Sequence, residues 1–178
     1  MTRTNLIGCL ICSALVIGSA QAADFRPGFY AVGAAGQTTF VSSTNTSSSL
    51  SGNSYLFSLG YEFTPSIAIE GGYGNLFTYN YTYSSSYYLK DTMDVLLISA
   101  VYKPFPGTIT PLLSIGSLSG TETYSSNYYG SSSYNYSKTT YGVGLEVPLD
   151  ERSGFRVNYL GITDSKTNSI SAGIIFRF

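Results

Sequence analysis

The stretch Ser169-Ile-Ser-Ala-Gly-Ile-Ile-Phe-Arg-Phe178 decides the fold of this chain. Side chains alternate between the two faces of a β-strand. One face of this stretch is apolar and carries Ile170, Ala172, Ile174, Phe176 and Phe178. The other face is mostly small or polar and carries Ser171, Gly173, Ile175 and Arg177. In water an exposed apolar strand at a sheet edge would pair with other chains and aggregate. A closed barrel in a membrane turns such a face to lipid. An ordinary amphipathic edge strand is the alternative.

Seven more segments alternate in the same way, at 29–41, 54–63, 67–77, 92–103, 109–119, 139–149 and 155–162. The segment 54–63 is the clearest, with an aromatic or leucine at every second position from Tyr55 to Phe63. Segments 92–103 and 109–119 are apolar on both faces, so their facing stays open. With the last stretch these segments predict an all-β fold, an eight-stranded antiparallel up-and-down transmembrane β-barrel.

The connections between these segments alternate in length. Short ones are expected at 64–66, 104–108 and 150–154, and long ones at 42–53, 78–91 and 120–138; the remaining one, 163–168, is short. All six prolines lie at or beside the short connections or the start of the first strand, where proline favours tight turns and does not interrupt a central strand. The pattern fits a barrel with short periplasmic turns and long external loops.

The N-terminus carries a predicted secretory signal peptide, residues 1–22, ending in Ala20-Gln-Ala22. Residues 23–178 then form the barrel domain. Both cysteines, Cys9 and Cys12, lie in the signal, so the mature chain is expected to have no disulfide. Loss of Arg3 leaves eight basic and ten acidic residues, a net charge of −2. Since there is no basic surplus, we expect no nucleic-acid partner.

The face opposite the apolar one is rich in glycine, which fits a narrow lumen better than a wet exterior. This face is predicted to carry Gly33, Gly60, Gly72, Gly74, Gly142, Gly144 and Gly173. Aromatic residues near the strand ends predict two girdles. One, at the short turns, comprises Tyr61, Phe63, Tyr102, Phe155, Phe176 and Phe178; the other comprises Phe40, Tyr55, Phe77, Tyr141 and Tyr159.

Charged residues on the small face gather near the short turns. They are Glu62, Glu70, Lys103, Glu146, Arg156 and Arg177. Facing lipid, a Lys or Arg at the midplane would cost about 2–4 kcal/mol, so we predict an internal charge network. Glu146 and Arg156 are equidistant from Glu151 in the hairpin turn and should lie opposite each other. A proton or ion path is the alternative, which is disfavoured because eight strands enclose little space.

Three motifs carry a resemblance to a known family: Gly28-Phe-Tyr-Ala-Val-Gly33, Ser58-Leu-Gly-Tyr-Glu-Phe63 and Phe176-Arg-Phe178. With the signal peptide and the eight strands, they resemble the small OmpA/OmpX-type outer-membrane β-barrel family. The resemblance implies a bacterial outer membrane location, contact with outer-membrane lipid, and assembly by the barrel-assembly machinery, with Phe176 and Phe178 as the assembly signal. Unlike OmpA, the chain is expected to lack a periplasmic peptidoglycan-binding domain.

Composition argues against catalysis. Some barrels of this class are enzymes that rely on a histidine activated by Ser, Asp or Glu. This chain has no histidine, and its mature part has no cysteine. We therefore expect no enzyme, no catalytic residue, no metal site and no cofactor.

Tyrosine dominates two of the expected external loops. They contain Tyr79, Tyr81, Tyr83, Tyr87 and Tyr88 in one, and Tyr124, Tyr128, Tyr129, Tyr134 and Tyr136 in the other. Tyrosine among Ser, Gly and Asn is the composition of an antibody paratope. This favours surface binding or adhesion, to host surface or matrix proteins, to a serum protein or to another copy. Tyr79, Tyr81 and Tyr83 keep period two with Tyr73 and Phe77, which would let the third strand run on past the membrane as a protruding sheet.

Two other functions stay open. The loops could merely shield a structural barrel that has no specific ligand. Less favoured is a narrow pore, because side chains usually fill an eight-stranded barrel.

Removing Phe178 should lower assembly in cells, because the resemblance makes this residue part of the signal read by the assembly machinery. The amount of folded protein at the cell surface measures the effect. Normal surface levels of the truncated chain would contradict the terminal signal.

Overall fold

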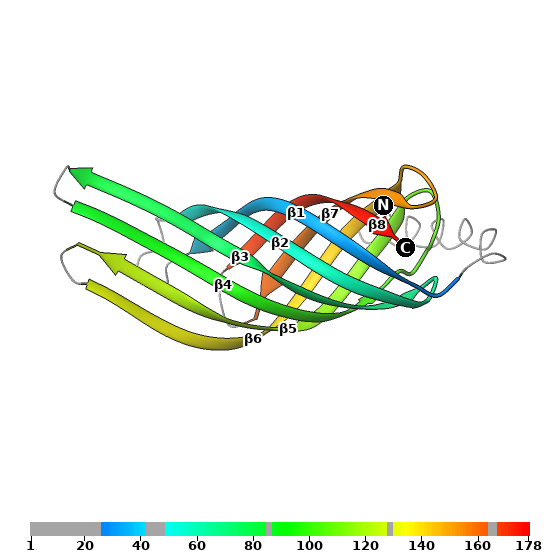
Figure 1. Cartoon of the computed structure of the whole chain (residues 1–178), viewed down its shortest axis with the longest axis horizontal. Coiled ribbons are helices and arrows are strands. Elements are labelled where there is room, and N and C mark those ends of the chain that lie inside the picture. Colours follow the sequence, from blue (N-terminus) through cyan, green and yellow to red (C-terminus); the bar gives the residue numbers. More distant parts are fainter. Residues whose placement is uncertain (1–25, 42–48, 85–86, 128–129, 164–166) are drawn as a thin grey trace, which may run out of the picture.

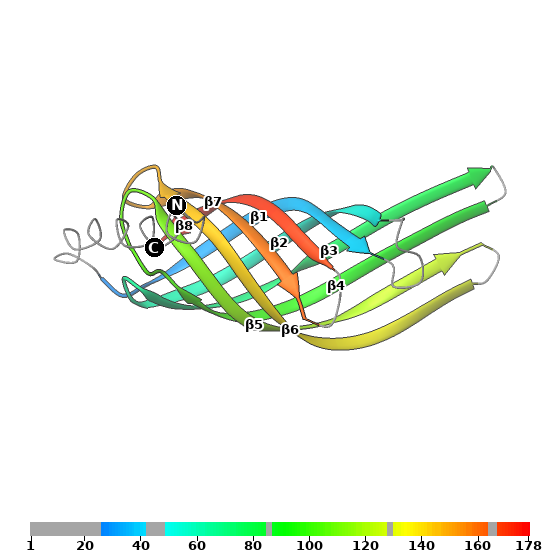
Figure 2. The same ribbon diagram turned by 180° about the vertical axis from the view of Figure 1, so that it is seen from behind.

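The structure, a computed structural model, describes residues 26–41, 49–84, 87–127, 130–163 and 167–178. Eight strands form one closed antiparallel barrel in chain order (Figures 1 and 2). They are β1 (Gly28–Val41), β2 (Ser49–Thr64), β3 (Ile67–Ser84), β4 (Tyr87–Tyr102), β5 (Thr110–Ser126), β6 (Gly130–Pro148), β7 (Ser153–Ile162) and β8 (Asn168–Arg177). The predicted fold class is confirmed. Within the described ranges, no helix is long and apolar enough to cross a membrane.

The barrel closes where β1 meets β8. Their register runs from Tyr30 opposite Arg177 to Thr39 opposite Asn168. The amide N–H of Phe178 adds a hydrogen bond of 3.0 Å to the carbonyl of Phe29. The stretch that ends the chain therefore completes the ring.

The two ends of the barrel differ. At one end, here the turn end, short connections join β2 to β3, β4 to β5 and β6 to β7. The last of these is an Asp-stabilised turn, in which Asp150 Oδ1 accepts the N–H groups of Arg152 at 2.7 Å and Ser153 at 2.6 Å. At the other end, here the protruding end, β3 to β6 extend beyond the remaining strands (Figure 2).

Two of the expected long loops are strands, so their prediction was wrong. β3 and β4 stay paired as far as Ser84 opposite Tyr87, and β5 and β6 as far as Ser126 opposite Gly130. The polar character of 78–91 and 120–138 suggested loops, but Tyr and Thr are good strand formers. Residues 42–48, 85–86, 128–129 and 164–166, and the predicted signal peptide, lie outside the described residues.

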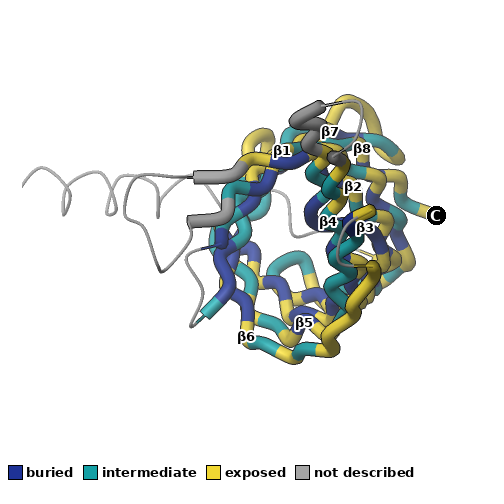
Figure 3. Tube along the Cα trace, turned by 90° about the vertical axis from the view of Figure 1, so that its left-hand side faces the viewer, coloured by how far each residue is buried: buried dark blue, intermediate teal, exposed yellow. Residues whose placement is uncertain are grey.

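Apolar side chains cover the outside of the barrel wall. The exposed members of this band include Phe57, Leu59, Phe63, Ile67, Ile69, Leu96, Ile98, Leu113, Ile115, Val143, Leu145, Val157, Ile170, Ile174 and Phe176. Figure 3 shows buried and exposed residues alternating along the strands around the ring. The structure also settles the facing of β4, where Met93, Val95 and Leu97 are buried while Leu96 and Ile98 are exposed.

The predicted facing of β1 was wrong. Tyr30 and Val32 are buried in the lumen, and Gly33 is exposed on the outside. Alternating alanine and glycine fit either face, so this part of the sequence carried little information. The other six glycines predicted on the small face are buried or half-buried.

A bulge changes the facing of β3. Its register with β4 shifts between Asn75 and Phe77. Tyr73 is therefore exposed while Phe77 is buried, so Phe77 does not belong to an outer girdle and the two residues do not share a face. An extra residue in one strand reverses the alternation beyond it, and the period-two pattern could not show this.

Replacing Gly60 with alanine should destabilise the barrel. A Cβ at Gly60 would overlap the buried ring of Tyr30, and overpacking of this kind typically costs about 1–3 kcal/mol. Gly71→Ala is the matched control, because a Cβ at Gly71 meets no heavy atom within 4 Å. The free energy of unfolding in urea, followed by circular dichroism in phospholipid vesicles, should fall for Gly60→Ala alone. Equal stability of both variants would refute the close packing of Tyr30.

Candidate functional site

Six charged side chains meet in the lumen near the turn end. They are Glu62, Glu70, Lys103, Glu146, Arg156 and Arg177, from β2, β3, the residue after β4, β6, β7 and β8. These are the residues that the sequence grouped together, and their three carboxylates balance their three cations. We call them the lumen charge network.

Glu146 lies at the centre of the lumen charge network. It is opposite Arg156 in the register of β6 and β7 and accepts hydrogen bonds from this residue at 2.8 and 3.2 Å. Its carboxylate also contacts Arg177 and lies 3.5 Å from Lys103 Nζ. The buried Glu146 carboxylate is thus paired with three cations that come from three other parts of the barrel wall.

The other two carboxylates share these cations. Lys103 Nζ donates to Glu62, and Arg177 Nε lies 3.7 Å from the same carboxylate. Arg156 Nη1 donates to Glu70 at 2.5 Å. Because every partner is paired, the desolvation of these buried groups is offset at least in part.

Tyr30 completes the network, and sequence reasoning missed it. Its hydroxyl donates to Glu70 at 2.6 Å, and its ring lies 5.7 Å from Lys103 Nζ and 5.5 Å from the Arg156 guanidinium carbon. These are favourable cation–π distances. The one useful signal was Gly60, which lies opposite Tyr30 in the register and leaves room for a large ring.

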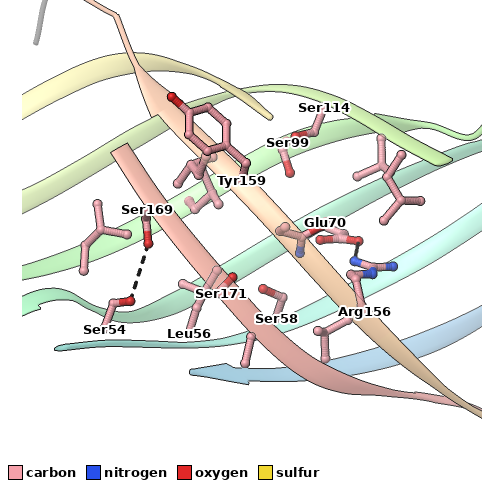
Figure 4. A pocket seen from close by; sticks show the side chains of 18 of the residues that line it. Ser54, Leu56, Ser58, Glu70, Ser99, Ser114, Arg156, Tyr159, Ser169 and Ser171 are labelled. Atoms are coloured by element: carbon pink, nitrogen blue, oxygen red, sulfur yellow. Dashed lines mark hydrogen bonds and ion pairs between the residues drawn. The ribbon is translucent and has the colours of Figure 1, made fainter. Parts of the chain in front are cut away.

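A small cavity of about 70 Å³ adjoins the lumen charge network at Glu70 and Arg156. Much of its polar lining comes from serines: Ser54, Ser58, Ser99, Ser114, Ser169 and Ser171 (Figure 4). Ser54 and Ser169 are 3.4 Å apart across it. The rest of its lining is largely apolar and includes Leu56, Leu76, Leu97, Leu112 and Leu160. No histidine is present in the chain to activate a serine.

An apolar cluster fills the lumen beyond this cavity, toward the protruding end. It contains Leu76, Phe77, Met93, Val95, Leu97, Leu118 and Ile162. Tyr79 and Tyr136 pack against it, and the rings of Tyr79 and Phe77 stack with centroids 6.2 Å apart. Across the described strands, no group of three His, Cys, Asp or Glu residues could hold a metal ion.

The ten tyrosines predicted in loops have different places. Eight lie in strands β3 to β6, and Tyr128 and Tyr129 lie outside the described residues. The side chains of Tyr81, Tyr83 and Tyr87 are also not described. Tyr134 and Tyr88 are 65% and 40% exposed, while Tyr79, Tyr124 and Tyr136 are half-buried. The structure thus brings the described tyrosines onto a paired sheet rather than onto loops.

The extended sheet has two polar faces. On the face that continues the lumen, Asp91 lies opposite Tyr79 and Tyr124, and Glu122 lies opposite Tyr134. A strand needs about ten residues to span a membrane. In β4, counted from Tyr102 at the turn end, these residues end at Met93. Asp91 therefore lies beyond the span. Burial first, and then the nearby Glu122, raises the pKa of Asp91 to about 6.

Hydroxyl groups form a ladder on the opposite face of this sheet. Thr121 donates to the Asn135 side chain at 2.9 Å, and the hydroxyls of Thr123 and Ser133 are 3.2 Å apart. Such cross-strand pairs stabilise a sheet. These side-chain contacts on this face add to the backbone ladder between β5 and β6.

The two phenylalanines of the predicted assembly signal lie on the outside at the turn end. Phe176 and Phe178 are 52% and 83% exposed. Their apolar rings are therefore accessible where β8 ends.

The comparisons with known proteins agree with this architecture. The family model described as outer membrane protein beta-barrel domain matches residues 9–178. No curated protein matches the chain in sequence.

Solved structures share the fold at low sequence identity. Neisserial surface protein A gives a TM-score of 0.68 at 18% identity, covering 86% of this chain and 100% of its own. Ail, the attachment invasion locus protein of Yersinia pestis, gives 0.64 at 16% identity, covering 85% and 98%. The N-terminal β-barrel domain of Pseudomonas aeruginosa OprF gives 0.62 at 17% identity, covering 85% and 98%.

Neutralising Glu146 should strongly destabilise the barrel. Glu146→Gln leaves three cations facing two carboxylates in the lumen, and breaking a buried ion pair from one side costs about 3–5 kcal/mol. Glu151→Gln, in the exposed turn after β6, is the matched control and should change stability by less than about 0.5 kcal/mol. Urea unfolding in phospholipid vesicles measures both variants. If both variants lose equally little free energy of unfolding, the lumen charge network contributes little to stability.

Proposed function

The chain belongs to the outer membrane protein β-barrel domain family and lies in the bacterial outer membrane, and from this premise we propose that it is a surface-binding protein. Its contact surface is the protruding sheet, defined as residues 79–84, 87–92, 120–127 and 130–138 of β3 to β6. The same proposal places the turn end in the periplasm and the protruding sheet outside the cell.

One observation carries this proposal: four strands continue as a paired sheet after their neighbours stop. β2 is last paired with β3 at Asn53 opposite Thr78, and β7 is last paired with β6 at Ile162 opposite Thr140. β4 and β5 remain paired out to Leu89 opposite Ser126. A barrel needs no such extension merely to cross lipid, since about ten residues per strand suffice.

An ordered sheet is well suited to binding. Its backbone is already fixed by the strand ladders, so less entropy is lost when a partner docks. Exposed Tyr134 and Tyr88 offer large amphipathic contact area. Tyr88 lies on the same face as the hydroxyl ladder, which adds hydrogen-bonding groups there, and Tyr134 lies on the opposite face.

The neighbours support a binding role without naming a ligand. Ail is an attachment and invasion protein and was crystallised with a heparin analogue, sucrose octasulfate. A polysulfated ligand needs a surplus of cations, but in the described protruding sheet Lys90 and Lys138 are balanced by Asp91 and Glu122. We therefore propose an uncharged or weakly cationic protein surface, on a host cell or in the matrix, rather than a sulfated polysaccharide.

Biogenesis belongs to the same proposal. Residues 1–22 are removed as a signal peptide, and the barrel-assembly machinery recognises Phe176 and Phe178. Binding by the protruding sheet, and not catalysis, is then the activity of the mature protein.

Shortening the protruding sheet should abolish binding and leave the barrel intact. Replacing 80–90 and 123–133 each with Asn-Gly keeps Tyr79 opposite Asp91 and Glu122 opposite Tyr134, and Asn-Gly favours a two-residue hairpin turn. Bacteria carrying this variant should bind epithelial cells and matrix proteins no better than bacteria without the protein. Heat-modifiable gel mobility checks that the barrel folds.

Two further variants separate the tyrosines from the sheet as a whole. Tyr88→Ser with Tyr134→Ser should reduce binding, while Thr121→Ser on the hydroxyl ladder should not. Undiminished binding by the shortened chain would favour a structural barrel without a specific ligand, and loss of its folded form would assign the extension to stability.

A further inference from the structure

We propose that the open edge of β6, residues 130–138, pairs with the same edge of a second copy held in a facing membrane. This inference rests on the proposed exposure of the protruding sheet outside the cell, and it names a partner for that sheet. The pairing would join two cells through one continuous antiparallel sheet.

The edge is open because β6 outruns β7. On one side β6 is paired with β5 along its whole extension, from Gly130 opposite Ser126 to Lys138 opposite Leu118. On the other side the register with β7 begins only at Thr140. Beyond Thr140 on that side, the N–H and hydroxyl of Thr163 donate to the carbonyl of Thr139 at 2.9 and 2.8 Å.

Strand geometry identifies the backbone groups that face this open side. The N–H and C=O of one residue point to the same side of a strand, and alternate residues repeat that direction. Since the Thr139 carbonyl points toward β7, the backbone groups of Ser137, Asn135, Ser133 and Ser131 point the same way. Among the described residues, no strand pairs with them there.

The side chains of these residues do not cover the edge. Ser137, Asn135 and Ser133 bond across to Ser119, Thr121 and Thr123 of β5, on the hydroxyl ladder. Edge strands are commonly protected by charges or proline, but residues 130–137 contain neither. Lys138 is the one charged residue of the segment 130–138.

The composition of the edge suits a second copy of itself. In an antiparallel pair centred on Tyr134, the two Tyr134 residues lie opposite each other, Tyr136 lies opposite Ser132, and Lys138 lies opposite Gly130. No like charges meet across the strands, and aromatic pairs of this kind are favourable.

Strand direction requires the second copy to come from a facing membrane. In every copy β6 runs from the protruding end toward the membrane. Strands of such barrels tilt about 35–45° from the barrel axis, so two copies in one membrane, related by an axis along its normal, would cross their edges at about twice that angle. A copy in a facing membrane, related by a two-fold axis perpendicular to the sheet, runs antiparallel at the same tilt. One such ladder is short, but many copies on two apposed surfaces would act together.

Aggregation of mixed bacterial cells tests the pairing. Cells that express the protein should clump and sediment, and differently labelled cells without it should stay out of the clumps. Recruitment of the cells without the protein would overturn the proposal, because it would show a different surface partner.

Charge exchange at the edge tests its chemistry. Cells with Ser133→Lys and Asn135→Lys should sediment only to the background of cells without the protein, and so should cells with Ser133→Glu and Asn135→Glu. A mixture of the two populations should clump again, because positions 133 and 135 then carry opposite charges across the strands. Unchanged clumping of either population alone, or no rescue in the mixture, would overturn the proposal.

A backbone variant tests the same edge independently. Asn135→Pro removes an N–H that points to the open side and leaves the ladder with β5 in place; Asn135→Thr is the control that keeps this N–H. Clumping should fall to background for the proline variant alone, with normal heat-modifiable mobility for both. Adhesion to epithelial cells is measured on the same strains and on cells with the unmodified protein. If the unmodified protein supports adhesion but no clumping, self-pairing is refuted while the proposed binding function is spared.

Discussion

The structure depends on one constraint: inside a membrane every backbone N–H and C=O must find its partner within the protein. Eight strands meet this constraint only when β8 returns to β1, and the register from Tyr30–Arg177 to Thr39–Asn168 closes the ring. Closure fixes which side chains face inward. The lumen charge network and the apolar cluster both follow from this, since their members come from strands that only the ring brings together.

A narrow lumen then sets the packing. A large inward side chain needs a small one beside it, as Tyr30 does at Gly60. Buried charges need partners, and Glu146 obtains three of them from different parts of the wall. Paired charges and two apolar clusters occupy much of the lumen, while the surface that can meet other molecules lies at the protruding end.

Outside the lipid this constraint no longer applies, because water can hydrogen-bond to the N–H and C=O groups of a strand edge. There β3 to β6 continue while their neighbours stop, and the same ladders that build the wall present an ordered sheet. This arrangement leaves an open side on β6, where no described strand pairs with the backbone groups. Residues 130–137 there carry neither the charges nor the proline that usually protect an edge. The proposed binding and self-pairing both use this part of the molecule.

The sequence by itself determined the strand number, the closed up-and-down order and the six charged residues that meet inside, because alternation and turn composition are local properties. It did not determine the facing of β1, where alanine and glycine fit either side, or of Phe77, where a bulge reverses the alternation. Nor could it separate strand from loop at Tyr79 or Tyr134, since their polarity suits both. Only pairing with neighbouring strands decided these points, because strand length, register and edges are properties of the assembled sheet.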